Sequence, residues 1–167
     1  MRETSVMPDD VPEAVERVSA YLREARAEAR VEEFQAGTPT AAHAARAVGC
    51  DLRNIVKSLV FDCGGRIAVA MVPGDRRADG GKVAAACGAG GASIASPARV
   101  KETTGFEPGA VSPFGLLRVD AVLIERTLLG LDRVWVGAGS TRHMAGVAPT
   151  ELVRLTRAVP LDIIADD

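Results

Sequence analysis

The pattern of hydrophobic and polar positions along the chain predicts short strands and helices in alternation. The run from Asn54 to Phe61 is apolar and rich in β-branched residues, which is typical of a strand covered on both faces. A Gly-Gly turn at 64–65 leads into a second apolar run, 67–72, so these two runs are expected to form a β-hairpin. Further short strands are predicted at 31–34, 93–95, 121–124, 134–136 and 159–164.

Helical spacing of apolar residues predicts five helices around these strands. The first is amphipathic, with its apolar positions between residues 11 and 29 on one face and Asp10 available as its N-cap. The second is rich in alanine; Thr38 or Thr40 can cap it, and Gly49 ends it. The others are predicted at 81–87, at 97–104 with Ser96 as cap and Gly105 as stop, and at 149–156 with Ala148 or Thr150 as cap.

Two glycine-containing segments interrupt this pattern and are expected to be loops. Two prolines and two glycines fall within the eight residues 108–115, which fixes an unusual and rigid backbone path. The other segment, 137–143, carries two glycines and ends at His143. The elements together predict an α+β (mixed α/β) fold: a single domain with a mixed central β-sheet flanked by helices. Residues 1–30 are assigned to a tail and the amphipathic helix, and residues 31–167 to the main domain.

Composition narrows the classes of function. The 167 residues are 47% hydrophobic and 25% charged, as in a globular domain, and the net charge of −2 excludes a general polyanion-binding surface. Three cysteines without C-x-x-C spacing and two histidines predict no metal site and no cofactor, and they fit a reduced, cytoplasmic setting. No apolar run approaches 18 residues, so membrane insertion is not expected.

The candidate chemistry begins with Lys57, in the middle of the first apolar run. An ammonium is rarely buried unless it is paired, so Lys57 either faces solvent on an edge strand or lines a cleft and meets an anion. Its apolar neighbours favour the cleft. Asp75, after Pro73-Gly74, is either a turn residue or a polar contact. Cys63 or Cys87 with His143 could form a nucleophile and base, but no recognisable signature surrounds either cysteine.

Several segments of the chain follow one another in a recognisable order. They are Thr40 with its helix, 55–61, 73–75, 82–84, 104–105, 109–115 and 137–139. This succession resembles the YbaK / prolyl-tRNA synthetase editing-domain family of aminoacyl-tRNA deacylases, over roughly residues 31 to 164. The single motifs are short, but the ordered set is specific, above all the lysine strand and the Val-Ser-Pro-Phe-Gly loop.

The resemblance implies a trans-editing hydrolase with the fold of the family. Such proteins cleave the ester between a wrongly attached small amino acid, such as Cys or Ala, and the terminal adenosine of a tRNA, often tRNA for proline. The expected partners are the acceptor end of mischarged tRNA and, as a second candidate, an aminoacyl-tRNA synthetase. The family is thought to use the substrate's own ribose hydroxyl to help activate water. The protein itself is expected to be a monomer or weak homodimer.

The resemblance also assigns roles to residues of this chain. Lys57 matches the family lysine that holds the 3′ end of the substrate. The loop 109–113 matches the one that supplies backbone amides near the scissile carbonyl, so the catalytic candidates are Lys57, Gly109, Ala110 and Ser112. The expected substrate-binding residues are Asp75, Val111, Pro113, Phe114, Gly137, Gly139 and His143. Of these, His143 is offset by about one residue from the functional histidine of the synthetase-embedded relatives.

Two alternative functions and one question about the loop remain open. A non-catalytic module of the same fold could capture an aminoacyl-adenosine-like ligand or a synthetase, and a cysteine-dependent hydrolase would lose activity when its thiols are blocked. Ala110 stands where many relatives have a second glycine. It would strain the loop if its φ were positive; otherwise its methyl group would narrow the pocket and favour smaller amino acids. The basic residues that could gather at the pocket mouth, although each is more often a solvated surface charge, are Arg53, Lys57, Arg99, Lys101, Arg118 and Arg142.

Overall fold

The computed structural model describes residues 11–35 and 37–166. In chain order its helices are α1 (Glu13–Glu24), α2 (Ala41–Val48), α3 (Gly80–Ala86), α4 (Pro97–Thr104) and α5 (Pro149–Thr156), with short 3-10 helices η2 (Leu52–Asn54) and η3 (Arg126–Gly130). Its strands are β1 (Ala29–Glu33), β2 (Val56–Cys63), β3 (Arg66–Pro73), β4 (Ser93–Ile94), β5 (Ala121–Glu125), β6 (Val134–Ser140), β7 (His143–Val147) and β8 (Val159–Leu161).

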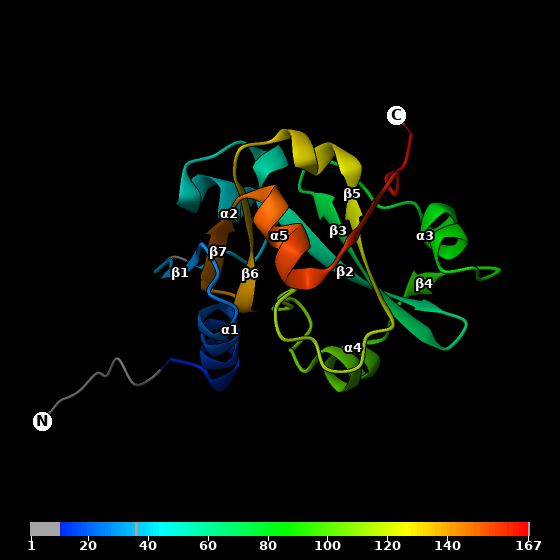
Figure 1. Ribbon diagram of the computed structural model, residues 1–167, viewed down its shortest axis with the longest axis horizontal. Coiled ribbons are helices and arrows are strands. Elements are labelled where there is room, and N and C mark those ends of the chain that lie inside the picture. The colour runs from blue at the N-terminus through cyan, green and yellow to red at the C-terminus, as the bar shows by residue number, and fades with distance from the viewer. Residues whose placement is uncertain (1–10, 36, 167) are drawn as a thin grey trace, which may run out of the picture.

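The strands form two sheets. The larger has the order β4-β2-β3-β5-β8 and is mixed, because β2 pairs antiparallel with β3 and β4, whereas β5 pairs in parallel with β3 and β8. The smaller is antiparallel and has the order β1-β7-β6. Figure 1 shows the smaller sheet to the left, with α1 below it, and the larger sheet to the right. The predicted mixed α/β single domain is confirmed, with its strands divided between two sheets.

The hydrophobic core lies mainly between the two sheets. Side chains from both sheets meet there with apolar residues of α1 and α5, including Val18, Leu22, Val56, Met71, Ile124, Val136, Ala145, Leu152 and Leu155. The opposite face of β2 and β3 packs against Val83 of α3. The two faces of β2 are therefore both covered for much of its length, as its apolar run predicts.

Local signals define most helix ends as the sequence indicates. The Thr40 side chain accepts from the N–H of His43 and caps α2, and Ser96 caps α4 in the same way. Gly49 and Gly105 end these two helices in the left-handed conformation, which costs glycine little. Asp10, the predicted cap of the first helix, lies outside the described residues.

Two predictions about elements are wrong. Helix α1 ends at Glu24, and residue 29 already belongs to β1. The segment 137–143 is not a loop: its glycines continue β6, and His143 begins β7 across a hairpin with a bulge. Glycine is needed there for close packing, because a Cβ on Gly137 would lie 2.7 Å from the carbonyl oxygen of Val111.

Gly139 provides a direct test of this packing. Its φ is +104°, and a Cβ there would lie 2.9 Å from backbone atoms of Ala14 in α1. Gly139→Ala is therefore expected to lower the free energy of unfolding by at least about 2 kcal/mol, through backbone strain and overpacking. Denaturant unfolding measures the change. Gly90→Ala is the matched control, because nothing lies within 4 Å of the added methyl group. Equal stability of the two variants would contradict the prediction.

Candidate functional site

A cavity of about 320 Å³ lies where the two sheets meet. Its wall comes from the start of α2, the first half of β2, the loop 109–111 and the hairpin of β6 and β7. The lining residues are Thr38, Pro39, Thr40, Ala41, Ala44, Ile55, Val56, Lys57, Ser58, Leu59, Gly109, Ala110, Val111, Gly137, Ser140, His143 and Met144.

The strand pairing explains why a cavity forms at this place. Strand β4 pairs with β2 only at Phe61 and Asp62, near the end of β2. On the same side, the described part of the chain offers the start of β2 only the single bridge between Ile55 and Trp135 of β6. The edge of β2 in between faces the loop 109–111 instead of a strand. Side chains and backbone groups from four distant segments therefore converge there.

Lys57 lies at this edge and is partly buried. Its Nζ donates to the carbonyl oxygen of Arg76 at 2.6 Å. Burial lowers the pKa of the Lys57 ammonium, the carboxylate of Asp75 opposes this change, and the charge of Arg77 adds to it. An ammonium has three N–H donors, so the bond to Arg76 leaves donors for a ligand. Asp75 itself is exposed and does not line the cavity.

The turn that anchors Lys57 is held by the end of the chain. The Arg76 guanidinium donates to the carbonyl of Ala165 at 3.0 Å, and the N–H of Ala165 donates to the carbonyl of Arg77 at 2.8 Å. Lys82, on α3, binds the carboxylates of Asp162 and Asp166, with both N–O distances at 3.1 Å. Residues 162–166 thus fix the turn whose carbonyl group orients the Lys57 ammonium.

The loop 107–110 is a tight turn. The N–H of Ala110 donates to the carbonyl of Glu107 at 2.9 Å, and Gly109 has φ +86°. Proline followed by glycine at the two central positions is the signature of a type II turn. Ala110 is not among the described non-glycine residues with positive φ, so the strain considered from the sequence does not arise. Its methyl group lines the cavity instead.

The rest of this loop is fixed by buried contacts. Ser112 is fully buried, and its Oγ accepts from the N–H of Phe114 at 3.1 Å. Phe114 is also fully buried and stacks on Tyr21 of α1, with ring centroids 6.1 Å apart. No acceptor for the N–H groups of Gly109 and Val111 is found among the described residues. The turn therefore presents two backbone donors on a rigid support.

His143 is buried beside the cavity at the start of β7. Its Nδ1 lies 2.6 Å from the Oγ of Ser140, which also accepts from the N–H of Arg142 at 2.9 Å. Burial lowers the pKa of the His143 imidazole, Glu33 opposes this change, and Arg142 adds to it. His143 is therefore held in its neutral form at pH values where an exposed histidine would begin to take up a proton.

The structure brings together six of the eleven predicted site residues: Lys57, Gly109, Ala110, Val111, Gly137 and His143 line one cavity. The other five do not line it: Asp75, Ser112, Pro113, Phe114 and Gly139. Four of those five are buried and support the loop or β6, whereas Asp75 acts on Lys57 through its charge.

Sequence reasoning missed several polar residues of the cavity. The Oγ of Ser58 is buried and has no hydrogen-bond partner in the described part of the chain. Ser140 and Thr38 also line the wall. The available signals were local: Ser58 directly follows Lys57, and Ser140 lies three residues before His143. Neither signal distinguishes a cavity residue from an ordinary strand residue, because the opposing wall comes from segments far away in sequence.

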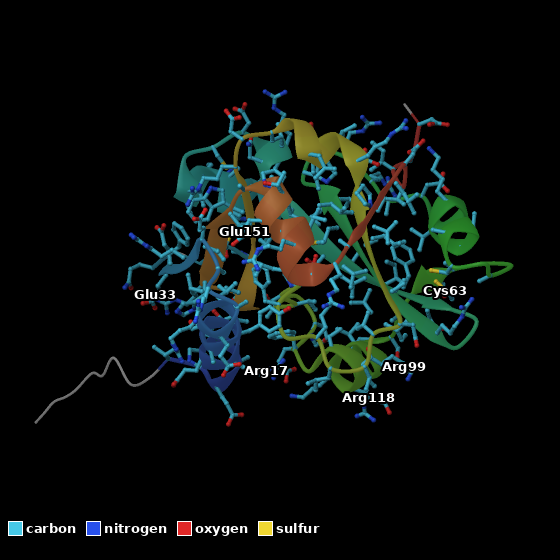
Figure 2. The ribbon with its side chains drawn as sticks, in the orientation of Figure 1. Arg17, Glu33, Cys63, Arg99, Arg118 and Glu151 are labelled. Carbon is cyan, nitrogen blue, oxygen red and sulfur yellow. The ribbon has the colours of Figure 1, made fainter. Side chains whose placement is uncertain are left out.

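The cysteines and most of the basic residues lie elsewhere. Cys63 is at the far end of β2, as Figure 2 shows, and burial beside Cys87 raises the pKa of its thiol to about 11. It therefore stays protonated and outside the cavity, which argues against a cysteine nucleophile. Arg99 and Arg118 line a separate hollow beside α4, so the expected cluster of cations at the cavity mouth does not form.

Two kinds of feature, a metal-binding cluster and a membrane-spanning helix, are not found in the described part of the chain. The described residues contain no group of three or more His, Cys, Asp or Glu side chains that could hold a metal ion. Among the described helices, none is long and apolar enough to cross a membrane.

Comparison with known proteins agrees with this geometry. Residues 35–155 match the model of the aminoacyl-tRNA editing domain. The chain is 31% identical over 140 residues to the uncharacterized protein YwhH of Bacillus subtilis, covering 83% of this chain and 88% of YwhH. It is also 31% identical over 137 residues to the proline–tRNA ligase of Xanthomonas oryzae pv. oryzae, covering 80% of this chain but only 24% of the ligase.

A solved structure is similar over nearly the whole chain. It is that of a candidate trans-editing enzyme for prolyl-tRNA synthetase, with a TM-score of 0.87 and 34% sequence identity, covering 94% of this chain and 100% of the other. The matched family segment contains all the residues that line the cavity. The protein therefore belongs to the aminoacyl-tRNA editing domain family.

Proposed function

We propose that this protein is a trans-editing aminoacyl-tRNA deacylase. Its substrate is the ester of a small mischarged amino acid, such as Cys or Ala, on tRNA for proline. The observation that carries the proposal is that one cavity is lined by Lys57, by the buried His143, and by Gly109 and Val111, whose N–H groups have no acceptor among the described residues. These groups suit an ester whose carbonyl oxygen gains negative charge during hydrolysis.

The chemistry needs little beyond positioning. An aminoacyl ester is already activated, so its hydrolysis depends mainly on a placed water and on stabilisation of the oxyanion. Removing one preorganised donor from an oxyanion hole costs about 3 kcal/mol in known enzymes. The N–H of Ala110 is used within its own turn, so the donors for the oxyanion are those of Gly109 and Val111. The ribose hydroxyl of the substrate serves to activate the water, so that hydrolysis needs no nucleophilic side chain.

Lys57 acts as a cation and not as a nucleophile in this proposal. Its ammonium is fixed by the Arg76 carbonyl and directs its remaining donors to the phosphate or ribose oxygens of the terminal adenosine. Burial lowers the pKa of the Lys57 ammonium, and the nearby carboxylate of Asp75 opposes this change and favours the charged form. The lysine therefore contributes binding and orientation of the 3′ end.

His143 is assigned a donor role through its tautomer. We assign the hydrogen of the Ser140 hydroxyl to Nδ1 of His143, because the same oxygen already accepts from the N–H of Arg142. The proton of the neutral ring is then on Nε2. Such a ring can donate from Nε2 to a substrate oxygen without carrying a charge.

Replacement of Lys57 tests its role in binding the substrate. We expect Lys57→Met to lower kcat/KM for the preferred ester about 10- to 100-fold, because it removes a charged hydrogen-bonding group. The assay is deacylation of Cys-, Ala-, Ser- and Pro-tRNA for proline, with tRNA for alanine as a further control. Lys101→Met is the matched variant, since Lys101 is exposed on α4 and makes only a surface ion pair with Glu107.

The outcomes of this assay separate the two functions considered from the sequence. Full activity of Lys57→Met would contradict the assigned role of the lysine. If the wild-type protein cleaves none of the esters but binds a non-hydrolysable aminoacyl-adenosine analogue, the protein is a binding module.

Replacement of Ala110 tests whether its methyl group limits the size of the substrate amino acid. Ala110→Gly removes a methyl group from the cavity wall without disturbing a strained backbone position. A methylene in an apolar pocket is worth about 1–3 kcal/mol, so kcat/KM for larger amino acids relative to alanine should rise about tenfold or more. Competition between Ala- and Cys-tRNA measures this ratio. An unchanged ratio would remove Ala110 as a determinant of size.

The burial of His143 makes the stability of the protein depend on pH. Folding lowers the pKa of His143, so the unfolded chain binds more protons as the pH falls below about 6.5. The contribution of His143 to stability is therefore present above that pH and is lost as the pH falls toward the folded pKa. His143→Gln should flatten this part of the unfolding profile. Titration of the His143 signal by NMR tests the shift directly, and a pKa at or above 6.5 would contradict it.

A further inference from the structure

Helix α1 lies before the matched family segment but touches two segments that also carry cavity residues, β6 and the loop after α4. Its residues Ala14, Arg17, Val18 and Tyr21 follow the spacing that places side chains on one helical face. The backbone of Ala14 packs against Gly139 of β6. The next two contacts of this face, through Arg17 and Tyr21, are with the loop that follows α4.

Arg17 contacts the start of the loop 105–115 and lies near its end. Its Nη2 donates to the carbonyl of Gly105 at 3.3 Å and approaches that of Thr104 at 3.5 Å. Its Cζ lies 4.4 Å from the centre of the Phe106 ring. At the other end of the loop, a Cβ on Gly115 would lie 3.7 Å from Nε of Arg17. Figure 2 shows Arg17 at the side of α1 that faces this loop.

The chemistry of these contacts favours arginine specifically. The carbonyl groups at the end of α4 carry partial negative charge, which a cation stabilises. The planar guanidinium can donate to them and lie against an aromatic ring at the same time, which a lysine ammonium does less well. The middle of the same loop carries Gly109, Ala110 and Val111, which line the cavity. One side chain thus joins α1 to the start of the loop that carries the backbone donors.

Stability alone does not account for an arginine at this position. The Nε of Arg17 is buried and has no hydrogen-bond partner in the described part of the chain. An unpaired buried donor is costly, and an apolar side chain of similar length would avoid that cost. Tyr21, one turn further along α1, already attaches the helix to the loop by stacking on Phe114. The feature specific to Arg17 is its hydrogen bond to the carbonyl of Gly105 and its contact with the Phe106 ring at the start of the loop.

We infer that Arg17 is a positioning residue, which fixes the loop 105–115 so that the N–H groups of Gly109 and Val111 stay directed into the cavity. The part of this inference that concerns activity rests on the proposed deacylase function. The part that concerns the order of the loop does not. Since the backbone donors act on the charge that develops during hydrolysis, their displacement should lower kcat and leave KM nearly unchanged.

The experiment compares Arg17→Met, Arg17→Lys and Arg23→Met. Arg23 lies on the same helix and is exposed, so its replacement is the matched control. Hydrogen–deuterium exchange is followed for peptides covering residues 105–116, together with denaturant unfolding and deacylation kinetics. We expect Arg17→Met to speed exchange in this segment about tenfold and to lower kcat about 10- to 100-fold, because a small misplacement of catalytic groups has effects of this size. Arg17→Lys should lie between Arg17→Met and the wild type.

Two results would overturn the inference. One is exchange in residues 105–116 that stays at the wild-type rate in Arg17→Met. The other is faster exchange spread evenly over the chain in proportion to a loss of global stability, which would mark a purely structural residue. If Arg17→Met fails to fold, Arg17→Lys gives the same comparison. If the wild-type protein hydrolyses no ester, the proposed function fails, while the exchange measurement still decides the role of Arg17.

Discussion

The close approach of two backbone segments, Gly137 of β6 and the carbonyl of Val111, is the constraint on which the site depends. With any side chain at residue 137, the added Cβ would lie 2.7 Å from that oxygen, and the loop would have to move away. The contact sets the loop against the smaller sheet, while the larger sheet provides Lys57 across the gap. The cavity is the space that remains between the two sheets once this contact is made. Its geometry is therefore a property of backbone packing more than of any single side chain.

This arrangement separates the residues that line the cavity from those that hold them. The lining is made of small groups, backbone amides and a few polar side chains from the matched segment 35–155. Support comes from outside that segment as well, from α1 on one side and from residues 162–166 on the other. Both supports act on turns: α1 on the loop after α4, and the end of the chain on the turn that carries Arg76. The editing segment is thus braced at each end by the parts of the chain that precede and follow it.

The sequence predicts the features that depend on local chemistry. Caps such as Thr40 and Ser96, the stops at Gly49 and Gly105, and the apolar lysine strand are defined by neighbouring residues, and the structure confirms them. The glycines at 137 and 139 were misread as a loop, because their reason is contact with distant segments and not backbone freedom in a turn. For the same reason sequence could not tell that Phe114 packs on Tyr21 while Ala110 faces the cavity, since both belong to one short motif. Ser58 and Arg17 were missed because the segments they face, the opposite wall of the cavity and the loop after α4, lie far away along the chain.

In the proposed deacylase, one loop would determine both the size of the pocket and the position of the backbone donors. Ala110 contributes a methyl group to the cavity wall and an N–H to the turn at Glu107, while its neighbours Gly109 and Val111 present their N–H groups without an acceptor among the described residues. The size of the pocket can therefore change through the side chain at 110, provided that the Pro108-Gly109 turn and the contact at Gly137 keep the amides in place. A side chain at residue 137 would not enlarge the pocket, and its contact with the Val111 carbonyl would displace the N–H groups of the loop. In the proposed deacylase, residue 110 can therefore change with the size of the edited amino acid, whereas Gly109 and Gly137 are needed to keep the backbone donors in place.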